Sequence, residues 1–494
     1  MKIKYKLVTK YLYFIGLFIF ALSICFKSGI APYNVNIFDS SSFIYIARLM
    51  QNGLTPYIDA FDHKGPLIYL INYIGLGFGG QIGIWFYEVI SMFISILFCY
   101  KTGITLTNNR LISFITIFCS FSILYIYLEG GNLTEEYALP FISISLYIFI
   151  KYFVSNKLII KSFELIVLGV SLGAVLMLRP NMIAIWIVYI STIIIKLLSE
   201  KQYKYLIVSL IYLLLGVLLV IIPFILYLLK NHAFSAFIEQ YLIFNFKYSS
   251  ANGLGSVLYA ILVFSSTNLF KISLLIFILL ILRAKKYNKI IIYSGFAFLI
   301  VNVLLITISG RIYNHYGMIL IPGFIIPISY LFQQIRINVI AKYSIVVQVI
   351  ILLVVVSTIT NYQLINFVHS YREIATRVEQ NKPGGKSELA QFIESNTTVD
   401  DLIIVFGIRA DIYLESNRYS ASKYFYQYPI GLVDEKIANE FIEDIKNYTP
   451  IIIVDSKNHF DKTDKMAVFL KQYTSHNYNK FNIDGLNVFL RMIK

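Results

Sequence analysis

The segment FDSSSFIYIARLMQNGLTPYIDAFDHKGPLIYL (residues 38–70) belongs to an interval that runs from about residue 27 to residue 81, between two long apolar runs. This interval is too long for a plain connector. Apolar residues recur in it at helical spacing, first over 43–50 and again over 67–74. Each stretch is too short to cross a bilayer, so the pattern predicts two amphipathic helices that lie at a membrane interface.

Asp39 stands at the beginning of the first of these helices, directly before three serines. An acidic residue at a helix start is typical of an N-cap, where its carboxylate accepts hydrogen bonds from backbone N–H groups. The same placement suits a catalytic carboxylate that takes a proton from a substrate. Spacing alone leaves both readings open.

The apolar runs outside this segment decide the fold class. The chain has 494 residues, of which 58% are hydrophobic and 14% charged, whereas a soluble domain carries about 25% charged residues. An ordinary cytosolic enzyme is thereby excluded, and runs of about 20 apolar residues predict helices that cross a bilayer. The first run follows four lysines and lacks a clear cleavage site, so it predicts a retained signal anchor. Eleven candidate spans cover approximately residues 11–26, 82–100, 111–128, 137–153, 163–178, 182–198, 205–229, 268–282, 290–308, 317–333 and 343–360.

The formal charge of +15 is a topology signal. Before residue 373 the chain holds 27 basic and 10 acidic residues, and the other 122 residues hold 15 and 17. With the N-terminus inside, 18 of those 27 basic residues fall in cytoplasmic loops or ends, as the Lys/Arg bias requires. We therefore expect no nucleic-acid partner, and eleven spans place the C-terminal tail outside.

The acidic residues before position 373 show the opposite distribution. Since Asp and Glu contribute little to topology, their gathering on the outer side needs another cause, and chemistry on that face is the natural candidate. Seven of the ten lie in predicted outer loops: Asp39, Asp59, Asp62, Glu129, Glu135, Glu136 and Glu239.

A basic signal anchor followed by this loop resembles the GT-C-fold bacterial glycosyltransferases, the polyprenyl-phosphate-sugar-dependent group related to protein mannosyltransferases and aminoarabinose transferases. The family pattern is an Asp, an aromatic residue a few positions on, G-x-x-P-Y and D-x-K-G-P. The matching positions are Asp39, Gly53, Pro56, Tyr57, Asp62, Lys64, Gly65 and Pro66. GGNLTEEYALP (130–140), LRPN (178–181) and GRIYNHYGMILIP (310–322) add support at outer span ends. Many relatives carry paired acids in the first loop; here a second carboxylate would come from Glu135 or Glu136.

The resemblance implies a polytopic α-helical protein of the bacterial cell (inner) membrane, with about eleven transmembrane helices and the catalytic part at 1–360. It further implies an inverting transfer of a sugar from a polyprenyl-phosphate donor to an extracytoplasmic glycan, teichoic acid, lipid or protein. Because nucleotide sugars are made in the cytoplasm, an enzyme on the outer face needs such a lipid-carried donor. The long outer loop at 27–81 is then its working surface.

Such a transfer needs a base for the acceptor hydroxyl and cations for the departing phosphate. Asp39 is the predicted base. Asp62 and His63 position the acceptor or only shape the loop, and Lys64 contacts phosphate or forms a solvated turn before Pro66. Arginine suits bidentate phosphate binding, although it also snorkels at interfaces. The predicted phosphate-binding residues are Arg179, Arg311, His315 and Tyr316. No repeated ligand spacing indicates zinc, and no cofactor is indicated; a divalent metal is left open without a pattern that indicates it.

The tail changes to alternating strands and helices after a linker at 361–386. Apolar runs predict strands at 401–407, 450–456 and 487–493, and amphipathic stretches predict helices at 387–395, 434–448 and 465–473. This pattern predicts an extracytoplasmic α/β domain at 387–494 with a partly parallel sheet. The Arg- and Tyr-rich stretch at 407–429 binds polysaccharide or forms a surface loop with a packed aromatic cluster. The tail contains no phosphate loop and no nucleophile elbow, so we expect it to have no catalytic activity of its own.

Two other functions remain open. A polysaccharide polymerase or ligase of the O-antigen type also uses lipid-linked donors, but its key Arg and His residues usually lie in large central loops. A lipid-linked sugar flippase would bind near the bilayer midplane and often shows internal repeats. The sequence shows no such repeat, and its richest outer loop is the first, which favours the transferase.

Overall fold

The computed structural model describes residues 2–25, 39–155, 159–250, 252–283, 288–338 and 386–492. The chain forms two compact units. Unit 1 comprises Met1–Gly29, Trp85–Phe224 and Asn252–Thr376, and unit 2 comprises Ile30–Ile84, Ile225–Ala251 and Arg377–Lys494. The predicted span at 343–360 and nearly all of the predicted linker lie outside the described residues.

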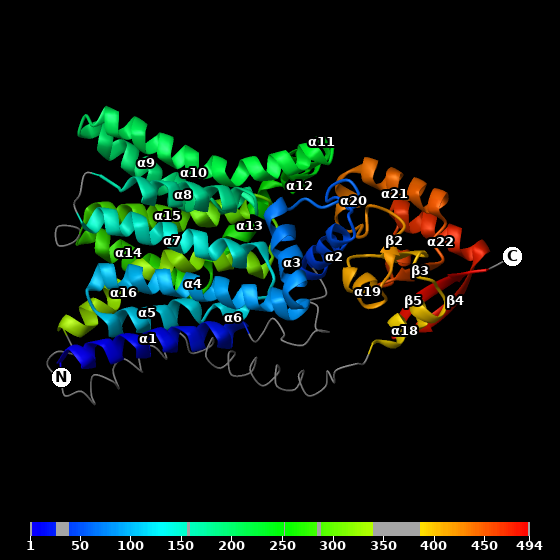
Figure 1. The fold of residues 1–494 in the computed structure, drawn as a ribbon, viewed down its shortest axis with the longest axis horizontal. Helices are drawn as coiled ribbons and strands as arrows, with labels where there is room; N and C mark the ends of the chain where they lie inside the picture. The colour runs from blue at the N-terminus through cyan, green and yellow to red at the C-terminus, as the bar shows by residue number, and fades with distance from the viewer. Residues whose placement is uncertain are drawn as a thin grey trace. The chain divides into compact units, whose positions relative to one another are not determined.

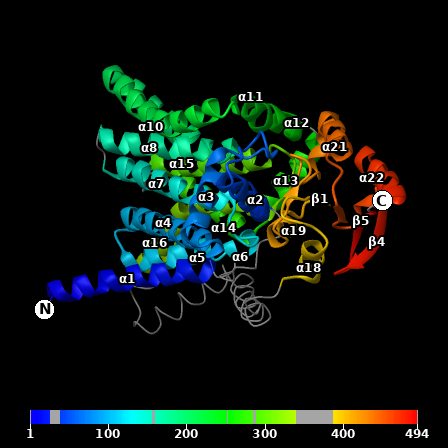
Figure 2. The ribbon, with the colours of Figure 1, turned by 45° about the vertical axis from the view of Figure 1, so that its right-hand side comes forward.

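Unit 1 is a bundle of helices, in which α4, α7, α15 and α16 run side by side (Figures 1 and 2). Neighbours in this bundle include α5 with α16, α7 with α8 and α9 with α15. Its helices are α1 (Lys2–Cys25), α4 (Gln81–Thr107), α5 (Arg110–Phe121), α6 (Leu124–Tyr127), α7 (Thr134–Val154), α8 (Ser162–Leu176), η2 (Pro180–Met182), α9 (Ala184–Ser199), α10 (Tyr203–Lys230), α13 (Leu254–Ser265), α14 (Asn268–Leu282), α15 (Lys289–Thr307), η5 (Asn314–Leu320) and α16 (Ile321–Asn338). The first residues of α4 and the last of α10 belong to unit 2.

Two glycines allow α8 and α10 to approach closely. A Cβ on Gly169 would lie 2.0 Å from the carbonyl oxygen of Leu213, and one on Gly216 would lie 2.2 Å from that of Ile166. Small residues at such a crossing let two backbones touch, which is a common means of helix association in membranes. The two glycines therefore determine how this pair of helices packs.

Five helices within the described residues are long and apolar enough to cross a membrane, judged by length and composition: α4, α7, α10, α15 and η5 with α16. The pair α13 and α14 also passes this test, with a bend of 83° between its halves. Helix α13 lies in a stretch for which the apolar runs predicted no span. Together with the apolar composition, these helices make the chain a membrane protein; the total of eleven spans stays a prediction.

In unit 2, α2 (Asp39–Gln51) and α3 (Pro66–Gly79) form at the two stretches of the first loop for which helices were predicted, and they pack on each other. Proline at the start of α3 suits a first helical turn, where its missing N–H leaves no bond unmade. A second helical segment of this unit consists of α11 (Phe234–Phe237), the π-helix η3 (Ile238–Ile243) and α12 (Phe244–Ser250).

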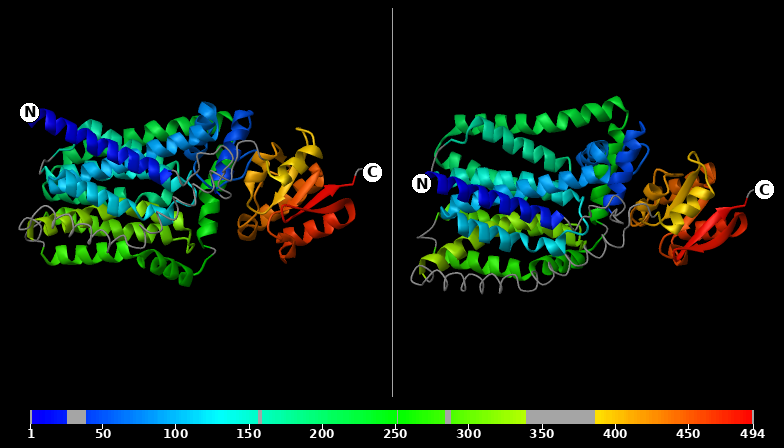
Figure 3. Two further views of the ribbon diagram at one scale, coloured as in Figure 1. Left: turned by 90° about the horizontal axis from the view of Figure 1, so that it is seen from below. Right: turned by 60° about the horizontal axis from the view of Figure 1, so that its bottom comes forward.

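The C-terminal part of unit 2 contains a five-stranded sheet with the order β2-β1-β3-β5-β4. Figure 3 shows the end of this sheet as red arrows, with helices of the same part beside it. The pairs β1–β2 and β1–β3 are parallel, and β3–β5 and β4–β5 are antiparallel. The predicted strands correspond to β1, β3 and β5, whose apolar side chains form the core. The elements are α18 (Glu388–Ser395), β1 (Leu402–Phe406), α19 (Ala410–Glu415), β2 (Tyr419–Ser420), α20 (Ile430–Val433), α21 (Glu435–Tyr448), β3 (Ile452–Asp455), η7 (His459–Asp461), α22 (Lys465–Asn477), β4 (Tyr478–Ile483) and β5 (Leu486–Arg491).

Candidate active site

The loop between α2 and α3 is held in one conformation by its own backbone and by η3. Tyr57 has a φ of 71°, a left-handed conformation that is uncommon for an aromatic residue. Its N–H donates to the carbonyl of Ala60 (2.9 Å), and its hydroxyl donates to the carbonyl of Lys64 (2.8 Å). Gln240 of η3 donates to the carbonyl of Tyr57 (2.6 Å) and accepts from the N–H of Asp62 (3.2 Å). Hydrogen bonds within the chain therefore hold the D-x-K-G-P stretch in place.

This loop brings four predicted site residues together with one from the tail. We call Asp39, Asp62, His63, Lys64 and Tyr426 the first-loop cluster. The ammonium of Lys64 lies 3.9 Å from Oδ2 of Asp39 and 3.1 Å from Nε2 of His63. The hydroxyl of Tyr426 donates to Oδ1 of Asp62 at 3.0 Å and lies 3.3 Å from Nδ1 of His63. A continuous chain of polar contacts thus runs from Asp39 to Tyr426.

Exposure separates the two carboxylates of this cluster. The side chain of Asp39 is 32% exposed, whereas that of Asp62 is 4% exposed. Asp62 also accepts a hydrogen bond from the N–H of His63 (2.7 Å). Asp39 can therefore reach a bound molecule, while Asp62 serves the internal arrangement of the loop.

Burial governs the protonation of the inner part of the cluster. It raises the pKa of Asp62 above the ordinary value of 3.8, although the ammonium of Lys64 opposes this shift. Burial and the nearby Asp62 carboxylate also raise the pKa of the Tyr426 hydroxyl well above its ordinary value. Tyr426 consequently stays protonated and acts as a hydrogen-bond donor over the whole physiological range.

His63 is enclosed by α12. Its ring packs against those of Phe244 and Tyr248, with centroid distances of 5.7 and 5.2 Å. Asn245 donates a hydrogen bond to its backbone carbonyl (2.7 Å). Only 12% of the His63 side chain is exposed, so α12 and Tyr426 together determine where its imidazole lies.

Tyr426 and Gln240 are site residues that the sequence analysis missed. Tyr426 lies in the aromatic stretch 407–429, for which a packed cluster was one of the two expectations, but nothing in the local pattern tied it to the first loop. Gln240 lies between the predicted spans at 205–229 and 268–282, where the sequence pattern identified no site residue. Both act through contacts with residues more than 100 positions away.

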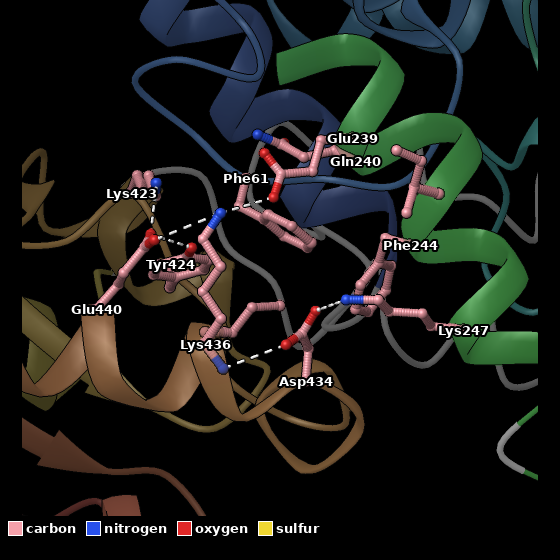
Figure 4. Close-up of a pocket in the computed structure, with 12 residues that line it drawn as sticks. Phe61, Glu239, Gln240, Phe244, Lys247, Lys423, Tyr424, Asp434, Lys436 and Glu440 are labelled. Atoms are coloured by element: carbon pink, nitrogen blue, oxygen red, sulfur yellow. Dashed lines mark hydrogen bonds and ion pairs between the residues drawn. The ribbon is translucent and has the colours of Figure 1, made fainter. Parts of the chain in front are cut away.

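A small hollow adjoins the cluster in unit 2 and encloses about 400 Å³, part of it open to solvent (Figure 4). Phe61 and Gln240 line it on one side, and Tyr424 and Glu440 on the other. Its charged side chains are largely paired with each other: Lys247 with Asp434 (2.8 Å), Lys436 with Glu239 (2.7 Å) and Lys423 with Glu440 (2.8 Å). The first two pairs connect α12 and η3 with the start of α21.

Unit 1 contains a second group of predicted site residues. Arg179, between α8 and η2, donates to Oε1 of Glu135 at 2.6 Å, and its guanidinium lies 4.0 Å from the ring centroid of Tyr316. The His315 ring packs edge-on against Tyr316, with 4.9 Å between centroids, and its Nδ1 lies 2.6 Å from a Glu129 carboxylate oxygen. We call these five residues the arginine cluster.

The remaining two predicted residues lie nearby in the chain. Glu136 follows Glu135 at the start of α7 and is fully buried. Arg311 belongs to the turn between α15 and η5 and is half-buried. The first-loop cluster belongs to unit 2 and the arginine cluster to unit 1. In the described ranges no three His, Cys, Asp or Glu side chains converge as metal ligands would.

Comparison with solved structures identifies the fold. The chain resembles ArnT from Cupriavidus metallidurans bound to undecaprenyl phosphate, with a TM-score of 0.64 and 14% identity over 97% of this chain and 98% of that one. The apo form of ArnT gives a TM-score of 0.56, with 12% identity over 98% of both chains. The archaeal oligosaccharyltransferase AglB from Archaeoglobus fulgidus, in complex with an inhibitory peptide and a dolichol-phosphate, gives 0.50, with 11% identity over 98% of this chain and 74% of that one. The chain therefore has the GT-C fold, which confirms the resemblance.

Sequence comparison places the chain in a family. The family model described as "Putative competence-induced protein Ccs4 N-terminal domain" matches residues 3–346, which is more than half of the chain. No curated protein sequence matches it.

Proposed function

This chain belongs to the Ccs4 N-terminal domain family, and we propose that it transfers a sugar from a polyprenyl-phosphate donor to an acceptor hydroxyl. The observation that carries the proposal is the placement of Asp39 at the start of α2, where its partly exposed carboxylate lies 3.9 Å from the buried ammonium of Lys64. The GT-C fold supports the class of reaction, because the similar ArnT structure contains undecaprenyl phosphate and the similar AglB structure contains a dolichol-phosphate.

In the proposed reaction the acceptor oxygen attacks the anomeric carbon of the donor sugar. A new C–O bond forms as the bond between that carbon and the phosphate oxygen breaks, and its electron pair leaves with the polyprenyl phosphate. Asp39 takes the hydroxyl proton and later releases it to water. A single displacement of this kind needs one base and inverts the anomeric configuration.

The other members of the first-loop cluster support this base. Lys64 places a positive charge 3.9 Å from the Asp39 carboxylate and so limits where that side chain can lie. Asp62 and His63 hold the Lys64 ammonium in turn, because a buried lysine needs partners that compensate its lost hydration. In this arrangement Lys64 acts on Asp39 and has no separate phosphate-binding role.

The arginine cluster has the composition of a phosphate-binding site. We propose that Arg179, His315 and Tyr316 contact the donor phosphate, with Arg311 in the adjoining turn as a further cation. Glu135 orients Arg179 through their 2.6 Å ion pair and takes no proton from the acceptor. The assignment of a second catalytic carboxylate to Glu136 stays a prediction.

The proposal includes a location. The Lys/Arg bias of the loops favours a multi-pass protein of the bacterial cell membrane, with a cytoplasmic N-terminus and both the first loop and the C-terminal part outside. The acceptor is then an extracytoplasmic glycan, lipid or protein.

The decisive experiment compares Asp39→Asn with wild type in membranes supplied with synthetic undecaprenyl-phosphate sugars, one at a time. We expect release of undecaprenyl phosphate to fall by about 10²–10⁴-fold, the usual contribution of a general base. Asp59→Asn is the matched control, because Asp59 is an exposed carboxylate of the same loop whose contact is a turn hydrogen bond from the N–H of Thr55. Release should be unchanged in this variant.

Two results would contradict the proposal. Equal release by Asp39→Asn and wild type would exclude Asp39 as the base. A cysteine placed at position 39 could also react with a thiol reagent only when the reagent is applied from the cytoplasmic side. That result would exclude the outer location and, with it, the need for a lipid-carried donor.

A further inference from the structure

The aromatic stretch 407–429 joins the C-terminal part of unit 2 to the first loop. The Phe61 N–H donates to the carbonyl of Lys423 (2.8 Å), and the Phe61 ring packs against that of Tyr424, with 5.3 Å between centroids. The hydroxyl of Tyr45, in α2, accepts from the N–H of Ser420 (2.9 Å). These bonds fix the stretch on the loop independently of Tyr426.

A second set of contacts holds the same stretch to α2. The guanidinium of Arg48 donates to the carbonyl of Leu414 (3.3 Å) and lies 5.4 Å from the ring centroid of Tyr419. Carbonyls at a helix end attract a cation, and Leu414 lies in the last turn of α19. The ring of Tyr45 packs between those of Tyr413 and Phe425, at 5.2 and 4.7 Å. The backbone around Tyr426 is thus anchored on both sides.

Within this frame the hydroxyl of Tyr426 meets both Asp62 and His63. All three side chains are almost fully enclosed, so the Tyr426 hydroxyl supplies a hydrogen bond to a carboxylate that is shielded from solvent. We propose that Tyr426 is a positioning residue of the catalytic cluster: it holds Asp62 and His63 so that Lys64 stays beside Asp39. The C-terminal part of the chain therefore contributes a residue to the active site. The catalytic part of this inference rests on the proposed function.

The test uses full-length protein in detergent and replaces Tyr426 by Phe, which removes only the hydroxyl. Tyr424→Phe is the matched control: its hydroxyl also donates to a carboxylate, Glu440 at 2.6 Å, but outside the cluster. The first readout is the rate at which diethyl pyrocarbonate modifies each histidine, resolved by peptide mass spectrometry. His459 is the internal reference because it is buried elsewhere in unit 2.

We expect modification of His63 to accelerate by about threefold or more in Tyr426→Phe, because its imidazole loses one of its restraints. His459 should react at the wild-type rate in all proteins, and Tyr424→Phe should leave His63 unchanged. An unchanged rate at His63 in Tyr426→Phe would overturn the proposal. Faster reaction at every histidine would also overturn it, since that would show a general loosening of the fold.

The second readout is sugar transfer. Tyr426→Phe should lower kcat by about tenfold with little change in KM, since misplacing a catalytic group slows the reaction without weakening substrate binding. If Tyr426→Phe shows faster modification of His63 alone but keeps the wild-type kcat, the catalytic role of Tyr426 is overturned. If wild-type protein transfers no sugar, the proposed function fails, and the catalytic role of Tyr426 fails with it; the modification rates would still decide whether Tyr426 holds His63.

Discussion

The ammonium of Lys64 lies 3.9 Å from Oδ2 of Asp39, and its side chain is only 10% exposed. A buried cation next to a half-exposed carboxylate produces an asymmetric pair. Lys64 is committed to the protein interior, whereas Asp39 keeps a face on which a substrate can bind. This asymmetry makes specific predictions about both stability and rate.

Removing the Lys64 charge should harm the fold as well as the reaction. We expect Lys64→Met to lower the free energy of unfolding by about 1–3 kcal/mol, because the buried carboxylate of Asp62 loses a compensating cation. Thermal unfolding in detergent measures this loss. Lys423→Met is the control, since its pair with Glu440 is more than one-third exposed on the lysine side and is worth about 0–1 kcal/mol. Equal losses in the two variants would contradict the buried role of Lys64.

Asp62 should make stability depend on pH. Because the pKa of Asp62 is raised on folding above 3.8, the folded state binds its proton more tightly than the unfolded state does. Stability from this group is present at low pH and is lost as pH rises through the folded pKa. Asp62→Asn should abolish this loss. The melting temperature of the variant minus that of wild type should therefore increase as pH rises. The opposite trend would show that Lys64 outweighs burial.

Glu135 and Arg179 should behave as one unit. Each single change, Glu135→Gln or Arg179→Met, leaves a buried partner uncompensated and should destabilise by about 3–5 kcal/mol. The double variant should lose less than the sum, with a coupling of about 0.5–3 kcal/mol. A double-mutant cycle of unfolding free energies measures this coupling. Strict additivity would exclude a direct interaction.

Asp434, which lines the small hollow, has two roles that can be tested separately: it caps a helix and it pairs with Lys247. Asp434 accepts from the N–H of Lys436 as the N-cap of α21, in addition to pairing with Lys247. Loss of a cap costs about 1 kcal/mol, and loss of an exposed pair costs about 0–1 kcal/mol. Asp434→Ala should therefore be more destabilising than Lys247→Ala in denaturant unfolding. Added salt should reduce the effect of Lys247→Ala and leave the cap effect in place.

The sequence by itself determined the local elements. Helices α2 and α3, α10 and strands β1, β3 and β5 follow from apolar spacing or apolar runs, because the period of the pattern and the period of the backbone must agree for one face to be buried. The motif around Asp39 and Lys64 also identified the GT-C fold, which the solved structures confirm. The bend between α13 and α14 was not predicted, because apolar composition does not show in which direction a helix axis turns.

Only the tertiary structure decided which side chains meet. Tyr426 contacts Asp62 across 364 residues, and Arg179 contacts Glu135 across 44. A local pattern records which face of an element is buried but carries no record of the distant surface that covers it. Asp39 and Asp62 look alike in the sequence. In the fold the Asp39 side chain stays partly exposed, whereas that of Asp62 is buried beside Tyr426. This difference in burial assigns one carboxylate to the proposed chemistry and the other to holding the loop.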